Sequence, residues 1–344
     1  MISGPELSAI VVSHRSAVEA SACVAALRAA FEHGGVEGEV VVVDCGSGPE
    51  EVSRLRGVSA DRFLPIENRG YSGGVNAGIS ESRGGFLLFC NADTELDPGA
   101  LRPLIEAAGS PRVGAAAPIQ FADRACRVFL PTGYGSGFLR DLAGAFRPGA
   151  DARFARHARR QWRLWTEGGD ADYLVGSVLV TRRDVVDRVG RFDEGFPFEY
   201  EETEWEDRLR ESGRALRVVA EARALHFPGT SSRRNPETEE RRALSRRRYR
   251  SRRYGRLGRA VLEGTESVLR RSAPEAPPVG PEAARADGSA LAFSPIPSLL
   301  PFAGVSLSSS VDVGEVARAL GGTMYVRTFR TGDGRPGPLG RAVA

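Results

Sequence analysis

Residues 39–48 read EVVVVDCGSG, and this stretch decides the fold of the chain. Its four consecutive valines leave no polar face, so residues 39–44 are predicted to form a parallel strand that is covered on both sides. Asp44 follows the valines directly, and Gly46 allows a tight turn after it. A carboxylate at the end of such a strand is typical of the ligand-binding edge of an α/β sheet.

Strand and helix signals alternate on both sides of this stretch. Further strands are predicted at residues 7–13, 62–65, 85–90 and 113–117. Helices are predicted at residues 16–31, 74–82 and 98–108. This alternation indicates an α/β fold with a doubly wound, mostly parallel sheet.

Polar side chains follow the ends of three predicted strands. They are Ser13-His14-Arg15, Asp44-Cys45-Gly46-Ser47 and Asn91-Ala92-Asp93. Because ligands bind at the carboxyl ends of parallel strands, we expect these groups to lie at one site. Asp44 can accept hydrogen bonds from a nucleobase or a ribose. Asp93 is a suitable oxygen ligand for a divalent cation that bridges a diphosphate.

A glycine-rich segment, NRGYSGGVNAG at residues 68–78, lies between the second and third of these groups. Its glycines, Gly74 among them, let a backbone approach a ligand closely where a helix starts. Asn76 can reach a ribose or another sugar. Since the chain has no lysine, any cationic side chain on a diphosphate must be an arginine, and Arg69 and the arginines of residues 119–170 are the candidates.

Three segments together resemble the nucleotide-sugar half of family-2 glycosyltransferases with the GT-A fold. They are VVVDCGSG at 41–48, NRGYSGGVNAGI at 68–79 and FLLFCNADTEL at 86–96. The last resembles the D-x-D motif of that family in the Asn-x-Asp form of its rhamnosyltransferase-like members. Residues 173–213 are similar to the family's acceptor-side stretch and its acidic helix. The resemblance covers about residues 7–260.

The resemblance implies roles for individual residues. The nucleotide-sugar site would be formed by Ser13, Arg15, Asp44, Gly46, Arg69, Gly74, Asn76, Asn91, Ala92 and Asp93. The acceptor side would include Gly176, Glu201, Glu204 and Trp205. Glu202 stands where the family has its general base. Asp93 and His226 would hold Mn²⁺ or Mg²⁺ as cofactor.

The expected reaction needs the same groups on chemical grounds. Direct displacement requires a carboxylate that takes the proton of the acceptor hydroxyl and a cation that stabilises the departing nucleoside diphosphate. A single displacement inverts the anomeric centre. If residues 201–213 are helical, then Glu202, Trp205 and Glu206 share one face of that helix.

The sequence also departs from the common family pattern. Glu202 and Glu204 replace the usual aspartates, so each carboxylate reaches one methylene further. Cys45 stands where Asp or Asn is frequent, and Ser13-His14-Arg15 replaces the usual first motif. These differences leave the choice of nucleotide open.

The charge of the chain is unevenly distributed. The 47 basic and 44 acidic side chains give a net charge of only +3. Residues 193–211 nevertheless carry nine carboxylates against two arginines, whereas residues 231–271 carry fourteen arginines against five glutamates. The basic segment has three interpretations: a solvated helix that neutralises the acidic segment, attachment of Arg241 to Arg259 to an anionic membrane surface, or nucleic-acid binding. The last is disfavoured because no nucleic-acid motif accompanies the charge.

The segments predict the following organisation. The GT-A catalytic domain spans residues 1–230, with a nucleotide-sugar half at 1–118 and an acceptor half at 119–230. It is followed by a basic helical extension at 231–271, a linker at 272–290 and a small tail at 291–344. Residues 119–170 are expected to be dominated by loops. In the tail, Asp312 is predicted to cap a helix, and residues 331–335 to turn a hairpin.

These features lead to one expected function with two alternatives. We expect an inverting, metal-dependent glycosyltransferase that moves a sugar from a nucleoside-diphosphate sugar to a hydroxyl of a glycan or lipid-linked acceptor. The Asn-Ala-Asp form favours dTDP-rhamnose by resemblance only. A nucleotidyltransferase acting on sugar phosphates is disfavoured, because Ser13-His14-Arg15 lacks the glycine-rich signature that binds a triphosphate. A catalytically inactive nucleotide-binding scaffold is the non-enzyme alternative.

Location and cysteine chemistry follow from two further observations. No apolar run approaches the roughly 20 residues that span a bilayer, and we expect a cytoplasmic enzyme, peripheral on the inner face of the cell membrane. The four cysteines are widely spaced and are interpreted as reduced structural thiols.

Overall fold

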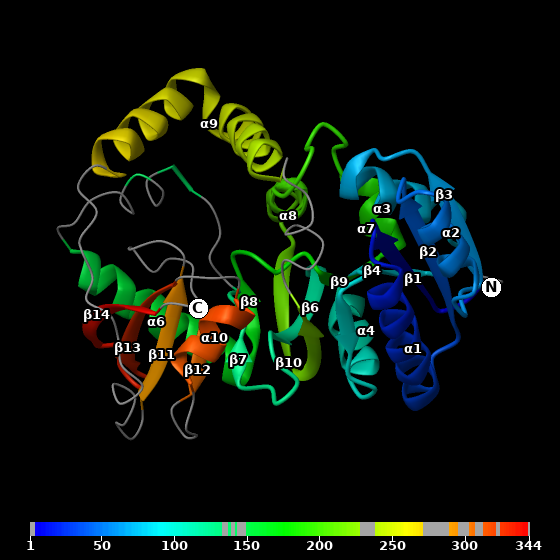
Figure 1. The fold of residues 1–344 in the computed structure, drawn as a ribbon, viewed down its shortest axis with the longest axis horizontal. Coiled ribbons are helices and arrows are strands. Elements are labelled where there is room, and N and C mark those ends of the chain that lie inside the picture. Colours follow the sequence, from blue (N-terminus) through cyan, green and yellow to red (C-terminus); the bar gives the residue numbers. More distant parts are fainter. Residues whose placement is uncertain are drawn as a thin grey trace. The chain divides into compact units, whose positions relative to one another are not determined.

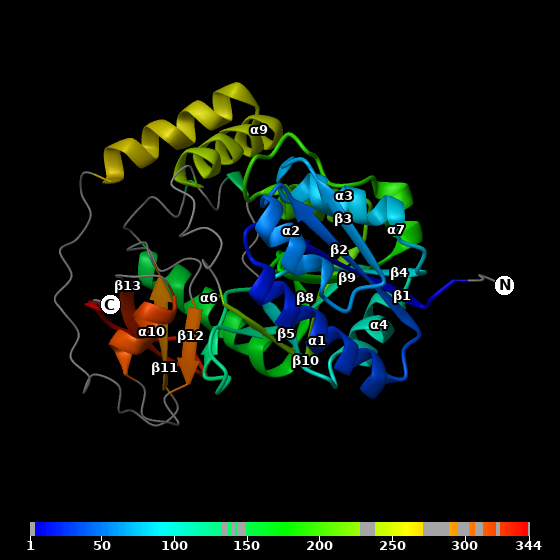
Figure 2. The same cartoon turned by 45° about the vertical axis from the view of Figure 1, so that its right-hand side comes forward.

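The computed structural model describes residues 4–132, 137–138, 142, 149–227, 238–270, 289–294, 303–306, 312–320 and 324–342. The chain divides into two compact units, which Figures 1 and 2 show as ribbons coloured along the sequence. The first unit comprises residues 1–120 and 168–249. The second comprises residues 121–167 and 250–344.

The first unit is built on parallel strands. Four strands, β1 (Leu7–Ser13), β2 (Gly38–Cys45), β3 (Arg62–Ile66) and β4 (Phe86–Asn91), pair in the order β4-β1-β2-β3. Two antiparallel strands, β9 (Val178–Arg182) and β6 (Val113–Phe121), extend the sheet beyond β4. The valines of β2 are fully buried, which confirms the predicted covered strand.

Helices cover both faces of these strands. They are α1 (Ala17–Gly34), α2 (Pro49–Arg56), α3 (Gly70–Glu81), α4 (Leu101–Gly109) and α7 (Arg183–Val189). Alternate residues of β1 serve opposite faces: Leu7 packs in the core formed with α1 and α4, whereas Ile10 contacts α3. Figure 1 shows α3 and α1 on opposite sides of the strands. The predicted α/β fold with a doubly wound sheet is confirmed.

A second strand group in the first unit is antiparallel. Strand β10 (Ala215–His226) pairs with β5 (Thr94–Leu96) and with β8 (Gly169–Ala171). Helix α8 (Glu201–Glu211) precedes β10 and lies where the acidic helix was predicted. The β5–β10 register sets His226 opposite Thr94, so the end of β10 meets the residues that follow β4.

The second unit contains an antiparallel sheet. Its strands are β7 (Val128–Phe129), β12 (Ala303–Ser306), β11 (Ser289–Ser294), β13 (Met324–Arg330) and β14 (Pro336–Ala342), in that order. The β13–β14 pair is the predicted hairpin. Asp312 caps α10 (Val313–Ala319) by accepting hydrogen bonds from the backbone N–H groups of Gly314 and Glu315, as predicted.

One expectation about the insert is wrong. Residues 119–170 were expected to be dominated by loops, yet α6 (Ala150–Glu167) is a helix of 18 residues. Its buried residues recur at helical spacing: Phe154, His157, Ala158, Gln161, Leu164 and Trp165. The arginines between them hide this apolar face in the sequence.

The units also differ from the predicted domain boundaries. Residues 121–167, assigned to the acceptor half, group with the C-terminal residues because β7 is hydrogen-bonded to β12 and shares its core. The basic segment is helical as predicted, in α9 (Thr238–Arg270), but Gly255 interrupts it with a left-handed φ of 71°. Residues 238–249 belong to the first unit. The predicted linker at 272–290 lies outside the described residues up to residue 288.

Candidate active site

The ends of β1 and β2 lie side by side. Ser13 pairs with Asp44 in the parallel register, and the backbone N–H of Arg15 donates to Ser47 Oγ at 2.7 Å. Asp44 is buried, and its carboxylate accepts hydrogen bonds from the N–H and the hydroxyl of Ser47. The first two predicted strand-end groups are therefore one structure. Gly46 has a φ of +69°, and a Cβ there would lie 3.1 Å from Asn68 N, which joins this loop to the glycine-rich segment.

The Asn-Ala-Asp motif follows β4 and is held by backbone hydrogen bonds. Asn91 N donates to Ser177 O at 2.9 Å, and Phe227 N donates to Asp93 O at 3.1 Å. Ala92, which lies between these two residues in the sequence, is buried. The motif is thus fixed between the residues that precede β9 and those that follow β10.

Asp93 and His226 meet at the end of β10. His226 Nε2 lies 3.6 Å from Asp93 Oδ1, and the two side chains are only 12% and 9% exposed. His226 Nδ1 is a buried nitrogen without a hydrogen-bond partner among the described residues. Burial lowers the pKa of His226, against the opposing charge of Asp93, and so favours the neutral imidazole that can bind a metal.

These two side chains fit part of a cation site. A carboxylate and a neutral imidazole are both ligands of Mn²⁺-like divalent cations. Among the described residues, no group of three or more His, Cys, Asp and Glu side chains could hold a metal ion. A cation at Asp93 and His226 would therefore need further ligands from outside this set.

Glu202 lies in the first turn of α8 and is surrounded by two other segments. Tyr173 donates its hydroxyl hydrogen to Glu202 Oε1 at 3.1 Å. A Cβ on Gly176 would lie 2.6 Å from Glu202 Cγ, so only a glycine fits there without displacing that side chain. Tyr71, from the first turn of α3, donates to the Gly176 carbonyl at 3.4 Å. The predicted base therefore lies where α3, α8 and the segment before β9 meet.

Burial makes this region electrostatically unusual. It raises the pKa of Glu202 to about 7, and the charge of Glu199 adds to the rise, while hydrogen bonds from the Glu202 backbone N–H and from Tyr173 oppose it. Burial and then Glu202 raise the pKa of Glu201 well above its ordinary value. A carboxyl group that ionises near neutral pH is suited to general-base catalysis.

Tyr71 connects Glu202 with the Asn-Ala-Asp motif. The pKa of its phenol is raised well above the ordinary value, first by burial and then by nearby groups that include Glu201, Glu202 and Asp93. The phenol also donates to Gly176 O, and Gly176 packs against Glu202. The next residue, Ser177, accepts a hydrogen bond from Asn91 N through its carbonyl. These contacts connect the predicted base with the Asn-Ala-Asp motif.

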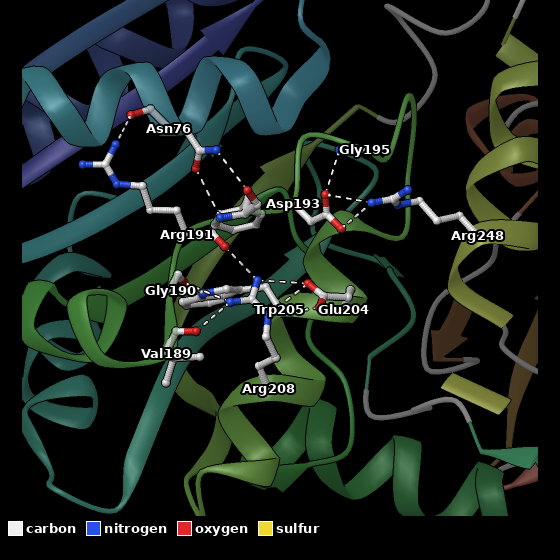
Figure 3. A network of polar contacts seen from close by, with 11 residues as sticks. Asn76, Val189, Gly190, Arg191, Asp193, Gly195, Glu204, Trp205, Arg208 and Arg248 are labelled. Atoms are coloured by element: carbon white, nitrogen blue, oxygen red, sulfur yellow. Dashed lines mark hydrogen bonds and ion pairs between the residues drawn. The ribbon is translucent and has the colours of Figure 1, made fainter. Parts of the chain in front are cut away.

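Two residues expected on the acceptor side have structural roles instead. Trp205 is fully buried, stacks on Phe192 at 5.1 Å between ring centroids and donates its Nε1–H to Gly190 O at 3.0 Å. Glu204 is engaged by Arg208, whose Nη2 lies 2.9 Å from Glu204 Oε2. Figure 3 shows both contacts. Neither side chain is available to touch an acceptor, because each is committed to packing α8.

Two residues of the glycine-rich segment are likewise structural. Asn76 donates to Phe192 O and to Glu194 Oε1, and its own Oδ1 accepts from Phe192 N, so its amide fastens α3 to this loop. Figure 3 shows the Asn76 side chain pointing from α3 toward the loop that carries Arg191 and Asp193. Gly74 lets α3 pack closely, since a Cβ there would lie 2.7 Å from Val12 Cγ1. Arg69 remains half exposed, with Nη1 3.3 Å from Glu194 Oε2.

One residue that organises this region was missed. Glu206 is buried, and both its carboxylate oxygens accept from Leu174 N at 3.2 Å. This contact fixes the segment that carries Tyr173 and Gly176. The sequence offered one indication of this role: Glu206 lies one helical turn after Glu202, on the same face of the predicted helix.

The chain is similar to a known protein family over nearly half of its length. Residues 8–168 match the model of glycosyl transferase family 2. The predicted resemblance to family-2 glycosyltransferases is confirmed over these residues.

Curated relatives agree with this family. The chain is 29% identical over 196 residues to N-acetylglucosaminyl-diphospho-decaprenol L-rhamnosyltransferase of Mycobacterium tuberculosis, in both strain CDC 1551 / Oshkosh and strain ATCC 25618 / H37Rv. The match covers 51% of this chain and 61% of each relative. The chain therefore matches about three fifths of the relatives' length.

Solved structures of glycosyltransferases also show similarity. GalNAc-T7 with UDP, GalNAc and Mn²⁺ has a TM-score of 0.45 at 15% identity and covers 65% of this chain and 44% of its own. Residues 1–349 of Staphylococcus aureus TarS have a TM-score of 0.42 at 16% identity, with 63% and 60% covered. The mannosyltransferase PcManGT of Pyrobaculum calidifontis, in complex with GDP-Man and Mn²⁺, has a TM-score of 0.44 at 15% identity, with 78% and 75% covered.

Proposed function

We propose that this glycosyltransferase transfers a sugar with inversion from a nucleoside-diphosphate sugar, with Glu202 as general base. The observation that supports the proposal is that neighbouring residues of one segment contact both parts of the site: Gly176 packs against Glu202, and Ser177 O accepts a hydrogen bond from Asn91 N. A donor-side cation ligand and an acceptor-side base at a single site are what direct displacement requires.

The proposed reaction is a single displacement. Glu202 removes the proton of the acceptor hydroxyl while the oxygen forms a bond to the anomeric carbon of the donor. The bond between that carbon and the diphosphate oxygen breaks, and its electron pair leaves with the nucleoside diphosphate. Tyr173 holds Glu202 Oε1 by a hydrogen bond and so orients the carboxylate toward the acceptor.

A divalent cation, Mn²⁺ or Mg²⁺, fits the site as a cofactor. Asp93 and His226 would hold it, and the neutral state that burial favours suits the imidazole to that task. When bound, the cation would neutralise the charge that develops on the leaving diphosphate. Asp44, Gly46 and Arg15 would surround the nucleoside, since the first two strand-end groups form one structure.

The donor and acceptor are proposed from the curated relative. Its name describes an L-rhamnosyltransferase that acts on a lipid-linked N-acetylglucosaminyl diphosphate. We therefore propose dTDP-rhamnose as donor and a lipid-linked glycan as acceptor, in the synthesis of a cell-wall or other polysaccharide.

An anionic membrane surface is the proposed location of this acceptor. Among the residues that the structure describes, four large hydrophobic side chains are exposed, and three of them, Leu244, Leu257 and Val261, lie on the arginine-rich α9. Basic and apolar side chains on one helix are typical of binding in the plane of a membrane interface. None of the helices described is both long and apolar enough to cross a bilayer.

Transfer assays test the proposed reaction. The purified enzyme is incubated with Mn²⁺, a lipid-linked N-acetylglucosaminyl diphosphate and, in turn, dTDP-, UDP- and GDP-sugars. We expect one donor to be used, and Glu202→Gln to lower kcat by about 10²- to 10⁴-fold because general-base catalysis is lost. Asp93→Asn should raise the Mn²⁺ concentration needed for half-maximal activity, and Glu211→Gln, at the exposed end of α8, is the control.

Other outcomes of these assays would contradict one of the assignments or identify one of the alternative functions. Full turnover by Glu202→Gln would contradict the assignment of the base, and unchanged activity of Asp93→Asn in chelator would contradict that of the cation ligand. Release of diphosphate from a nucleoside triphosphate and a sugar phosphate would identify a nucleotidyltransferase. Binding of a nucleotide without reaction of any donor would identify an inactive scaffold.

A further inference from the structure

The segment before Glu202 is held by the start of α9. Residues 190–200 connect α7 to α8, and Asp193, Glu194 and Glu199 in this connection are three of the nine carboxylates of residues 193–211. At one end of the segment, Arg248 Nη2 lies 2.9 Å from Asp193 Oδ2, as Figure 3 shows. The Arg248 guanidinium also lies over the ring of Phe196, 5.3 Å from its centroid.

The other end of the segment is held more tightly. Arg242 makes a two-pronged pair with Glu199, with Nε 2.7 Å from Oε2 and Nη2 2.8 Å from Oε1. The same guanidinium lies over the Phe198 ring at 5.5 Å from its centroid. Phe198 N donates to Ser245 Oγ at 3.1 Å. Two successive residues are thus fixed by side chains one helical turn apart on α9.

The backbone at this end adopts an unfavourable conformation. Glu199 and Tyr200 have φ values of +61° and +70°, in the left-handed region that residues other than glycine rarely adopt. Such conformations persist only where the surrounding structure imposes them, and they occur often at active sites. Here the next two residues are Glu201 and Glu202, so these two dihedral angles set the direction in which α8 starts.

The far side of Glu202 is fastened to the same part of α9. The ring of Tyr249 lies 5.4 Å from that of Tyr200, and its hydroxyl donates to Asp207 Oδ2, on the second turn of α8, at 2.7 Å. Both rings and the Asp207 carboxylate belong to the first unit. Residues 238–249 therefore contact the chain both before and after Glu202.

We propose that residues 238–249 form a clamp that imposes the left-handed turn at Glu199 and Tyr200, with Arg242 as a positioning residue for Glu202. This inference rests on the proposed function of Glu202, which Arg242 is not shown to touch. Arg242 acts through Glu199 and the turn. Arg242 and Arg248 serve the protein's own acidic segment, so they are separate from any arginines of α9 that bind an external surface.

The test compares Arg242→Ala with Arg188→Ala, which removes the same charge from an exposed arginine that pairs with Asp184 on α7. Hydrogen exchange of residues 198–206 measures the clamp without reference to activity. We expect faster exchange in Arg242→Ala only. In the transfer assay, kcat should fall about 10- to 100-fold in Arg242→Ala, as for a misplaced catalytic group, while KM for the donor changes less than about twofold.

Two further readouts separate positioning from a loss of folding. Arg242→Lys keeps the charge but not the two-pronged geometry, so it should recover part of kcat and serves if the alanine variant does not fold. Without Arg242, the charge of Glu199 is uncompensated and further opposes ionisation of Glu202. The acid limb of the kcat profile should then move to higher pH.

Two results would overturn the clamp. One is exchange in residues 198–206 that is equal in Arg242→Ala and Arg188→Ala. The other is faster exchange with an unchanged kcat and pH profile, which would show a turn with no effect on the base. A wild-type enzyme that transfers no sugar would contradict the proposed function, and the exchange data would still decide the clamp.

Discussion

Glu202 owes its proposed function to where it is buried. Free glutamates ionise well below neutral pH, whereas this carboxyl group has a pKa of about 7, raised by burial and by Glu199. As a base it must be ionised, so the active fraction falls as the pH drops below 7. The hydrogen bond from Tyr173 favours the ionised form and limits the rise.

We therefore predict a kcat profile with an acid limb near pH 7, falling about tenfold per pH unit below it. Removing the hydroxyl in Tyr173→Phe destabilises the ionised carboxylate, and the limb should shift upward by about half to one pH unit. The loss of activity should consequently be larger at pH 6 than at pH 8.5. Tyr325→Phe, in β13 of the second unit, should leave the profile unchanged. An identical profile for Tyr173→Phe and wild type would contradict the role of this hydrogen bond.

Residue identity alone does not separate a ligand-binding role from a structural one. Glu202, Asp93 and His226 were predicted as site residues because carboxylates and imidazoles at strand and helix ends suit metal and proton chemistry, and their roles stay predictions. Asn76 and Trp205 were assigned to ligands, but the structure uses the amide to fasten the loop after α7 and the indole to fill the core. A polar or aromatic side chain looks the same in sequence whether its partner is a ligand or the protein itself.

At the scale of elements, α3 packs so closely on β1 that only a glycine fits at position 78. A Cβ on Gly78 would lie 2.3 Å from Ile10 Cγ2, in the interior of the first unit. Gly264, in the exposed second half of α9, would place its Cβ where no atom lies within 4 Å. The same substitution should therefore have opposite effects at the two positions.

We predict that Gly78→Ala destabilises the first unit by about 1–3 kcal/mol, the usual cost of overpacking a core. Gly264→Ala should stabilise α9 by about 0.5–1 kcal/mol, because glycine is a poor helix former. Urea denaturation followed by circular dichroism measures both changes. A stabilising or neutral Gly78→Ala would contradict the close packing of α3 on β1.

Elements were predictable where their pattern was simple. The consecutive valines of β2 and the strand–helix alternation around them correctly predicted the α/β fold of the first unit. Helix α6 was missed because its buried positions include the polar residues His157 and Gln161, and arginines lie between them. The grouping of residues 121–167 with the C-terminal strands could not be predicted, because the β7–β12 pairing joins segments far apart in the chain.

At the scale of the whole molecule, the arginines of α9 fall into two groups. Some pair with carboxylates of the protein itself, and others are exposed beside apolar side chains. Arg242 and Arg248 pair with carboxylates of the first unit. Leu257, 80% exposed, and Val261, one turn later, form an apolar strip beside the exposed Arg256. The membrane proposal therefore concerns the half of α9 that follows Gly255.

We predict that the protein sediments with vesicles containing anionic lipid and not with neutral vesicles, and that 0.5 M salt releases it. Leu257→Asp should weaken this binding by about tenfold or more, since it removes an apolar side chain and adds a negative charge at the interface. Val18→Asp, which makes the same kind of change at a 71% exposed position on α1, is the control. Equal binding by both variants, or none to either vesicle, would contradict the proposal.

The positive φ of Gly255 has a consequence for how the two parts of α9 can vary. In an unbroken helix, an insertion in one part would rotate the residues of the other part about the helix axis. The break at Gly255 interrupts this coupling. Arg242 and Arg248 contact carboxylates of the acidic segment, so substitutions at the start of α9 are constrained by those contacts. The residues after Gly255 do not share this constraint, so they can change to suit the surface that they are proposed to bind while these contacts are kept.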